Sequence, residues 1–436
     1  MWDELRQENA CRFSTVQEEK IARIDRFKFV FRLARTMASF CWPIILLSFH
    51  LISNTQSYRS AEEVEKELME KFEQQGDVYS REEVIKEIGE FEEPLLTHMN
   101  HTMMTNYLHA LADAYPNLTH LYSIGSSVRG RQLWVLTISK YPRKHEIGVP
   151  EFKYIANMHG NEVSGRVFLL GLAWTLLHNY RTNGWIRNLV DTTRIHLLPT
   201  MNPDGYEIAY EGDEAGIYGR SNANNKDLNR NFPSRFPNYF PSEQLQPETV
   251  AVMKWTKSIP FILSASLHGG TTLVNYPFDD HPTRSASRRY SPSPDNELFV
   301  RLAYSYSKVH DRMNKQKTMF KSTSKKAEEH DGGTCRYIVS GGMQDWNYLH
   351  TNCFELTIEL NCVKYPPRSE LKALWDENKY PLLYFIKQIH KALRRPHSFH
   401  IIEKDAKIRR EGVSVDGMCE RNYGRLEGGV DGWALE

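Results

Sequence analysis

Charge of one sign, cysteine and long apolar runs are all scarce in this sequence of 436 residues. The 55 Lys and Arg balance 54 Asp and Glu, so the near-neutral charge gives no electrostatic reason to expect nucleic acid as a partner. The six cysteines are too few for a small disulfide scaffold, and no Cys-x-x-Cys pair predicts a cysteine zinc site. The 40% hydrophobic and 25% charged residues are instead typical of a chain that buries a core.

The apolar run from Met37 to Ile52 is shorter than the ~20 residues that a comfortable membrane span needs. It follows a basic flank and has the length of a signal peptide's apolar region. Translation from Met37 would make it a signal peptide, whereas translation from Met1 would make it a signal anchor. Both alternatives place the remaining chain in the secretory pathway, secreted or luminal, and the second adds membrane association through residues 37–54. Two Asn-x-Thr sequons would be glycosylation acceptors there.

Composition divides the chain into a polar basic tail (1–36), the apolar run (37–54), an acidic linker or pro-segment (55–95), a domain (96–393) and a charged tail (394–436). The Glu-rich linker has few large apolar residues, so we expect it to be helical and solvated. In the domain, strands are predicted at Leu133–Ser139, Lys153–Met158, Arg194–Met201, Phe261–Leu267 and Cys353–Leu360, and helices at Val163–Tyr180, Pro247–Lys257, Asn296–Asn314 and Glu370–Ala392. This alternation predicts a single α/β domain with a mixed, mostly parallel central sheet and helices on both faces.

Two histidines and a glutamate stand where predicted strands end. His159 follows an apolar strand and forms a His-x-x-Glu pair with Glu162, and His268 follows a second strand. Ligand sites of open α/β sheets lie at the carboxyl ends of their strands, and a hydrolytic zinc takes three protein ligands. A second His-x-x-Glu pair, His400 and Glu403, lies in the unpatterned tail, and we interpret it as a chance match.

Two further segments carry polar groups that suit chemistry. Arg220 and Arg230 lie ten residues apart in a loop rich in asparagine, a setting that favours an anionic ligand such as a carboxylate. In the last predicted strand, alternation places Glu355 and Glu359 on one face. Such a carboxylate is either a general base beside a metal or part of the solvated face of an edge strand.

Together these segments resemble the zinc metallocarboxypeptidases, specifically the regulatory branch that contains carboxypeptidases E, M, N and D. The resemblance runs from about Leu96 to Leu393 and follows the family's order of motifs. The motifs that carry it are Asn157–Glu162, Asn202–Tyr206, Asp227–Pro233, Leu267–Gly270, Tyr276–Asp280, Gly341–Asp345 and Thr357–Leu360. Seven motifs in order are far more specific than any one of them.

The resemblance implies one Zn²⁺ per chain held by His159, Glu162 and His268, with Glu359 as general base and Arg220 polarising the scissile carbonyl. It further implies a substrate site of Asn229 and Arg230 for the terminal carboxylate, Tyr337 closing over it, and Asp279 and Gln344 facing a basic side chain. The implied activity is removal of C-terminal Lys or Arg from peptides or proteins. The alternatives are a non-catalytic binding or chaperone member of the branch and a zinc deacylase of the same fold.

The chain departs from the branch after the domain. Members usually continue with a transthyretin-like β-sandwich, and residues 394–436 show no series of alternating strands, so we expect that module to be missing or replaced. Cys335, Cys353, Cys362 and Cys419 permit three fully paired connectivities or free thiols.

Overall fold

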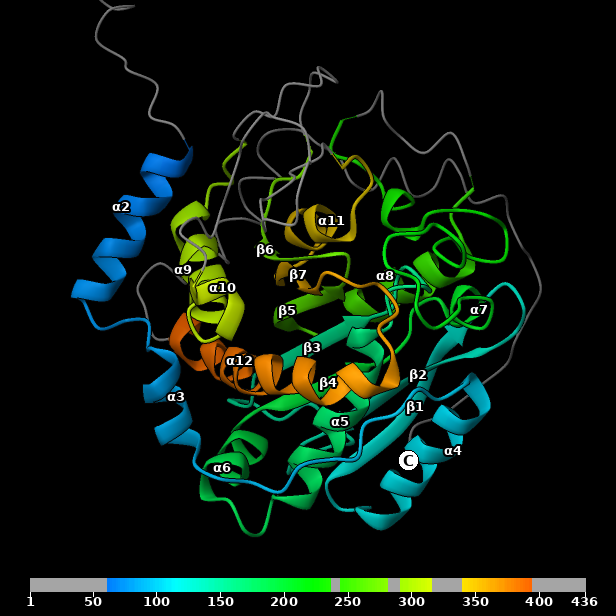
Figure 1. The fold of residues 1–436 in the computed structure, drawn as a ribbon, viewed down its shortest axis with the longest axis horizontal. Coiled ribbons are helices and arrows are strands. Elements are labelled where there is room, and N and C mark those ends of the chain that lie inside the picture. The colour runs from blue at the N-terminus through cyan, green and yellow to red at the C-terminus, as the bar shows by residue number, and fades with distance from the viewer. Residues whose placement is uncertain (1–60, 237–243, 281–290, 316–338, 394–436) are drawn as a thin grey trace, which may run out of the picture. The chain divides into compact units, whose positions relative to one another are not determined.

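The structure is a computed structural model that describes residues 61–236, 244–280, 291–315 and 339–393 (Figure 1). The chain divides after Ser60 into two units, and every described residue belongs to the second. The predicted signal segment and the C-terminal tail therefore lie outside the described residues. Within the described ranges, no helix combines the length and the apolar character that crossing a bilayer would require.

A seven-stranded sheet forms the centre of the fold. Its strands are β1 (Thr119–Ser126), β2 (Gln132–Ile138), β3 (Glu151–Ala156), β4 (Arg194–Leu198), β5 (Phe261–His268), β6 (Thr271–Asn275) and β7 (Phe354–Asn361). They lie in the order β1-β2-β4-β3-β5-β7-β6. Strands β4, β3, β5 and β7 run parallel to one another. Strand β2 pairs antiparallel with β4, β1 pairs antiparallel with β2, and β6 pairs antiparallel with β7. The predicted mixed, mostly parallel sheet is confirmed.

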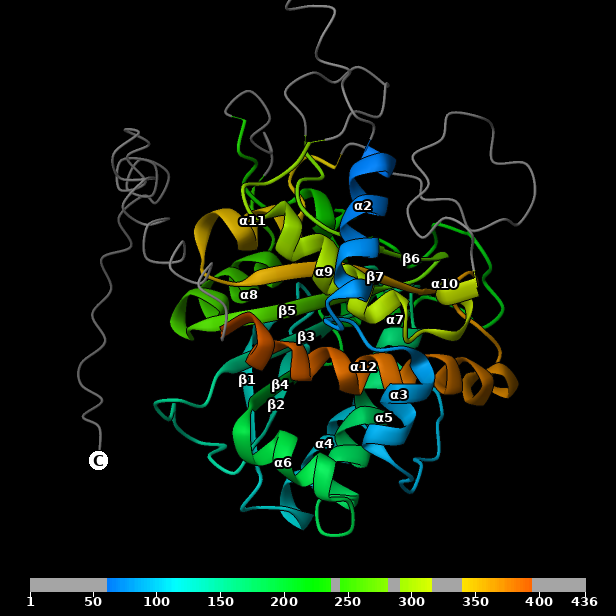
Figure 2. The same ribbon diagram turned by 90° about the vertical axis from the view of Figure 1, so that its left-hand side faces the viewer.

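Helices cover both faces of the sheet, as predicted. They are α2 (Ala61–Gln74), α3 (Arg81–Ile88), α4 (His101–Ala114), α5 (Ser164–His178), α6 (Gly184–Thr192), α7 (Pro203–Tyr206), α8 (Pro247–Ser258), α9 (Asn296–Ser307), α10 (Asp311–Lys315), α11 (Met343–His350) and α12 (Leu371–Leu393). Helices α5 and α12 pack on one face and α8 and α11 on the other (Figures 1 and 2). Alternation along β3 sends Tyr154 into the first core and Ile155 into the second, which also contains Trp255 and Trp346.

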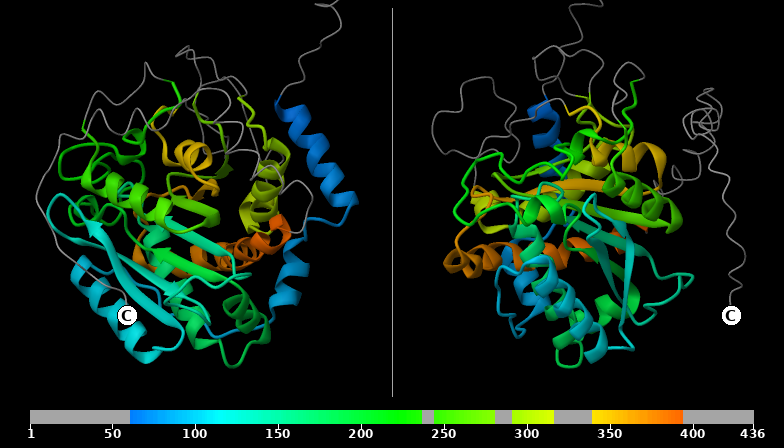
Figure 3. Two further views of the ribbon diagram at one scale, coloured as in Figure 1. Left: turned by 180° about the vertical axis from the view of Figure 1, so that it is seen from behind. Right: turned by 90° about the vertical axis from the view of Figure 1, so that its right-hand side faces the viewer.

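The two strands that the sequence pattern missed, β1 and β6, are the edges of the sheet. An edge strand has one neighbour and is usually short or polar, so it lacks the continuous apolar run of a central strand. β1 accordingly has one buried residue, while β3 is buried throughout. Figure 3 shows β1 from behind, with α4 alongside it. The five predicted strands are all present, with shifted ends.

The predicted helix at Asn296–Asn314 is two helices, α9 and α10, that meet at His310. The ring Nδ1 of His310 accepts hydrogen bonds from the backbone N–H groups of Arg312 and Met313 at 3.2 and 3.3 Å. A side chain that satisfies the first N–H groups of a helix marks its beginning. The apolar periodicity continues across this junction, so it does not reveal the break.

The expectation of a solvated segment at 55–95 is wrong for the part that the structure describes. Helices α2 and α3 form as the pattern predicts, but Phe72 and Val84 are fully buried against the domain. The guanidinium of Arg81 donates to the backbone carbonyl of Asp376 at 2.9 Å. The many glutamates mask a few apolar residues on one helical face, and burial depends on that face rather than on average composition.

Glu355 is also not part of a solvated face. Its strand, β7, lies between β5 and β6, and Glu355 is fully buried. The carboxylate lies 3.0 Å from the ammonium of Lys153, which also donates to the hydroxyl of Ser264 and the amide oxygen of Asn347. A buried charge needs such partners, so Glu355 is committed to an ion pair inside the core.

Candidate active site

The loop after β3 is shaped around Asn157, which adopts a left-handed φ of 56° that Asn tolerates better than most residues. Its amide nitrogen donates to the backbone carbonyls of His159, Gly160 and Glu162 at 3.0, 2.9 and 3.1 Å. Gly160 is required within this loop because a Cβ there would lie 2.3 Å from the backbone nitrogen of Tyr206. The loop therefore turns the His159 and Glu162 side chains toward the strand ends.

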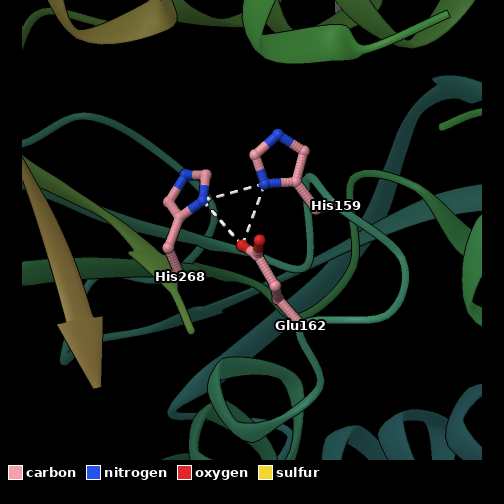
Figure 4. A group of neighbouring side chains, drawn as sticks. All are labelled: His159, Glu162 and His268. Atoms are coloured by element: carbon pink, nitrogen blue, oxygen red, sulfur yellow. Dashed lines mark hydrogen bonds and ion pairs between the residues drawn. The ribbon is translucent and has the colours of Figure 1, made fainter. Parts of the chain in front are cut away.

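The side chains of His159, Glu162 and His268 point toward one another (Figure 4). The two Nδ1 atoms lie 3.2 Å apart, and each lies 2.9 Å from Oε2 of Glu162. All three residues are buried. Burial alone would raise the pKa of Glu162, but the two imidazoles outweigh it and hold that pKa well below its usual range. We call these residues the metal trio.

The metal trio fits a zinc ion. Ligand nitrogens and oxygens bound to a tetrahedral zinc at 2.0–2.1 Å lie about 3.3 Å from one another, close to the spacing found here. Two imidazole nitrogens and one carboxylate oxygen are also the donor set of a hydrolytic zinc site, which leaves a fourth position open. No other group of three or more such ligands occurs among the described residues.

Asp227 lies beside the metal trio and was missed by the sequence analysis. Its Oδ1 is 3.1 Å from Nε2 of His159, and its Oδ2 accepts two hydrogen bonds from Arg220 at 3.1 and 2.9 Å. A carboxylate on the far nitrogen of a ligand histidine fixes the ring and its tautomer. In the sequence, Asp227 is the first residue of the Asp227–Pro233 motif and an acid among asparagines, and neither fact names its partner.

We expect Asp227→Asn to weaken zinc binding about 10–100-fold while the protein stays folded, because the amide cannot hold the His159 ring as a carboxylate does. Competition with a zinc chelator measures this affinity. Asp213→Asn is the matched control. Asp213 is also a buried acid, and it accepts a hydrogen bond from the amide of Asn161, which lies between His159 and Glu162 in the chain. Its described hydrogen bonds include none to the metal trio. Equal zinc affinity in the Asp227 variant and the unaltered protein would contradict the role.

Glu359 reaches the site from β7, where it pairs in register with His268 of β5. Its Oε2 is closed off from solvent and has no hydrogen-bond partner in the described structure. Burial raises the pKa of Glu359 to about 8, with the His268 imidazole opposing that rise and the Glu162 carboxylate adding to it. Glu355 lies four residues, or about 13 Å, further back along the strand. The structure thus brings Glu359 and not Glu355 to the metal trio.

The predicted anion-binding residues Arg220, Asn229 and Arg230 lie in one loop beside the metal trio. The guanidinium of Arg220 donates to Oε1 of Glu162 at 3.1 Å, so it lies against the metal trio. Asn229 uses its amide oxygen to accept the backbone N–H of Met343 at 3.0 Å, which leaves its amide nitrogen as a donor for a ligand. Arg230 is exposed beside it. Tyr337, the remaining predicted residue of this group, lies outside the described residues.

Asp345, which directly follows Gln344 in the sequence, binds the backbone of Asp279. The carboxylate of Asp345 accepts the backbone N–H groups of Asp279 and Asp280 at 2.9–3.1 Å, which places Asp279 against the start of α11. Gln344 is buried, yet neither atom of its amide has a hydrogen-bond partner in the described structure. A buried amide without partners is costly, so these two atoms require partners that the described contacts do not include.

The segment before α11 lies next to the loop of Asn229 and Arg230. Gly341 has a φ of +77°, and a Cβ there would lie 2.6 Å from the carbonyl oxygen of Arg230. The backbone of Phe232 also donates to the carbonyl of Gly341 at 3.0 Å.

Among the described cysteines, Cys353 is a buried free thiol and Cys362 an exposed one, so these two are not paired.

Comparisons with known proteins identify the family of this chain. A family model described as zinc carboxypeptidase matches residues 104–381. Human carboxypeptidase D is 50% identical over 299 residues, which are 68% of this chain and 21% of that protein. Mouse carboxypeptidase M is 45% identical over 289 residues, which are 66% of this chain and 64% of that protein. The chain thus spans about a fifth of the length of the carboxypeptidase D relatives.

Solved structures show the same fold at low sequence identity. Carboxypeptidase A from Helicoverpa armigera superposes with a TM-score of 0.54 and 18% identity, over 68% of this chain and 75% of that one. Thrombin-activatable fibrinolysis inhibitor superposes with a TM-score of 0.52 and 19% identity, again over 68% of this chain and 75% of that one. With the family model covering more than half of the residues, the chain belongs to the zinc carboxypeptidase family, in the regulatory branch with carboxypeptidases D, M and Z.

Proposed function

We propose that the protein is a zinc-dependent metallocarboxypeptidase that removes C-terminal Lys or Arg from peptides or proteins. The observation that carries this proposal is the buried metal trio with the unpartnered carboxylate of Glu359 beside it. A structural zinc site has four protein ligands and needs no base, whereas a hydrolytic site has three ligands, an open position and a general base. Family membership and the sequence resemblance support the same activity.

Each residue around the metal trio has a distinct part in this reaction. His159, Glu162 and His268 would hold the zinc ion, which would supply Lewis acidity for the hydrolysis. Glu359 accepts the proton of the attacking water and passes it to the leaving amine. Arg220 donates to the developing oxyanion, a contact of a kind worth about 3–4 kcal/mol.

Asn229 and Arg230 account for exopeptidase specificity. A free C-terminal carboxylate accepts hydrogen bonds from a guanidinium in bidentate geometry, and the Asn229 amide adds a neutral donor. An internal peptide bond has no carboxylate to offer at this position. We place the substrate's last residue between this clamp and the side chains of Asp279 and Gln344, because the backbone of Arg230 packs against Gly341, just before α11.

The pocket residues favour a basic side chain. A Lys or Arg head that leaves water requires a counter-charge and hydrogen-bond acceptors, which Asp279 and the amide oxygen of Gln344 supply. Asp279 is half-buried and accepts from the amide of Asn275 at 2.6 Å, which fixes its carboxylate. Gln344, which directly precedes Asp345 at the start of α11, is buried and would add its amide oxygen as an acceptor.

Cleavage of hippuryl-Arg is expected to exceed that of hippuryl-Phe, and Asp279→Asn is expected to lower kcat/KM for hippuryl-Arg about 100-fold. That loss corresponds to about 2.7 kcal/mol, within the range for removing one partner of a desolvated charge pair. Asn keeps the shape of the side chain, so the rate on hippuryl-Phe should change little. Initial-rate kinetics on both substrates test the basic specificity, and equal kcat/KM values for the two in the unaltered protein would rule it out.

We further propose that the protein acts in the secretory pathway, as the apolar run that follows a basic flank suggests. Both sequon asparagines, Asn100 and Asn117, are exposed, so the fold has room for a glycan at either one. Protein expressed in animal cells should carry N-linked glycan and gain gel mobility after PNGase F treatment. Unchanged mobility would count against this compartment. Anchoring through residues 37–54 remains a prediction.

A further inference from the structure

A buried carboxylate in the first described helix contacts the loop that forms the substrate pocket. Glu65 of α2 is 3% exposed, although most of its neighbours on this Glu-rich helix face solvent. Its Oε1 accepts a hydrogen bond from the phenol of Tyr276, which is itself 1% exposed. Carboxylates are rarely buried unless they are paired, so this contact is a specific feature of how α2 docks.

Tyr276 begins the segment that leads to the pocket acid. Only Pro277 and Phe278 separate it from Asp279. The Tyr276 ring is stacked with the ring of Phe299 in α9, with centroids 6.5 Å apart and planes 12° apart. Helix α2 lies alongside α9 (Figures 1 and 2), so the hydroxyl of Tyr276 is held by one helix and its ring by the other.

The other end of this segment is held from α11. The ring of Phe278 meets the ring of Tyr348 edge-on, with centroids 5.4 Å apart, and the phenol of Tyr348 donates to Asp295 at 2.7 Å. The backbone N–H of Asp279 is bound by the carboxylate of Asp345. Residues 276–280, which we call the pocket segment, are therefore fixed at the end by α11 and at the start by α2.

We propose that α2 supports the substrate pocket from outside and that Glu65 is a positioning residue for Asp279, acting through Tyr276. This inference rests on the proposed function and extends it to a segment that its composition suggested was a linker or a pro-segment. Specificity for a charged side chain depends on where the counter-charge is held, and misplacement by about 1 Å can cost 100-fold in rate. A helix that fixes the start of the pocket segment thus contributes to substrate choice without touching substrate.

Helix α2 also provides a matched control. Glu73, two turns further along the helix, accepts a hydrogen bond from the phenol of Tyr304 and pairs with Lys308 at 2.7 Å. This is the same kind of tyrosine–carboxylate contact, but Tyr304 lies in α9 and not in the pocket segment. Loss of the Glu73 contact should weaken the docking of α2 without moving Asp279.

The experiment compares Glu65→Ala, Glu65→Gln and Glu73→Ala in the full chain. The measured quantity is the selectivity ratio, which is kcat/KM for hippuryl-Arg divided by kcat/KM for hippuryl-Phe. Glu65→Ala is expected to lower this ratio about tenfold. Glu65→Gln should restore it, because the amide oxygen still accepts from Tyr276, and Glu73→Ala should leave it unchanged. A merely structural role would lower both rates together and would not move the ratio.

An unchanged ratio in Glu65→Ala, an equal fall in Glu73→Ala, or no rescue by Glu65→Gln would each overturn the inference. If Glu65→Ala does not accumulate as folded protein, Tyr276→Phe removes only the hydroxyl donor and should give the same tenfold fall. An unaltered protein that cleaves neither substrate refutes the proposed function and this inference with it. If the unaltered protein prefers hippuryl-Arg and the Glu65→Ala variant keeps the same selectivity ratio, the inference is refuted and the proposed function stands.

Discussion

Replacing Glu359 with Gln is expected to lower kcat about 1,000-fold while zinc stays bound. A general base contributes about 10²–10⁴-fold, and Gln matches the shape of Glu but cannot accept a proton. Because Glu359 lies opposite His268 without belonging to the metal trio, its loss should leave the ligand set intact. Measuring kcat together with the zinc content of the same preparation separates loss of the base from loss of the metal.

Glu355→Gln is the matched control for this experiment, since Glu355 lies on the same face of the same strand. Its carboxylate is paired with Lys153 inside the core, so the variant leaves a buried ammonium without its counter-charge. Breaking a buried pair costs about 3–5 kcal/mol, so Tm should fall while kcat of the folded protein is kept. Substantial turnover in Glu359→Gln, or a 1,000-fold loss in Glu355→Gln, would contradict the assignment of the base.

Removing a ligand of the metal trio should lower activity as much as replacing Glu359 does. We expect His268→Ala to lower zinc content from about one ion per chain to a small fraction, and activity in parallel, because two ligands do not complete a hydrolytic zinc site. o-Phenanthroline should likewise abolish activity in the unaltered protein, and added Zn²⁺ should restore it. Metal analysis of dialysed protein alongside initial rates provides the measurement.

His400→Ala is the control for the ligand variant, because His400 and Glu403 form the second His-x-x-Glu pair in the chain. It should change neither zinc content nor rate. Retained zinc and activity in His268→Ala would show that the metal trio is not the zinc site. Protein that folds, binds peptides and holds no zinc in its unaltered form would favour the non-catalytic alternative.

Sequence patterns predicted the parts of the fold that are buried on both sides. Central strands such as β3 and β5 are continuous apolar runs, and the pattern found them. The edges β1 and β6 pair on one side only, and neither carries a continuous apolar run of the kind the central strands have. The solvated linker was the clearest error, because a few residues such as Phe72 decide whether a helix packs, and average charge conceals them.

The metal trio could be predicted because parallel strands end at one edge of the sheet, which brings His159 and His268 together from distant positions. Asp227, Asp345 and Glu65 could not be predicted in this way. Each acts on a partner far away in the sequence through a hydrogen bond, and an acid in a loop or helix carries no local sign of that partner. Such supporting residues become visible only when the packing is known.

Zinc-edge anomalous diffraction from crystals of the unaltered protein would locate the metal. We expect one strong anomalous peak, within about 2.0–2.3 Å of Nδ1 of His159, Nδ1 of His268 and a carboxylate oxygen of Glu162. A zinc peak bound by other side chains, or no zinc peak in zinc-supplemented crystals of active protein, would show that the metal trio is not the zinc site.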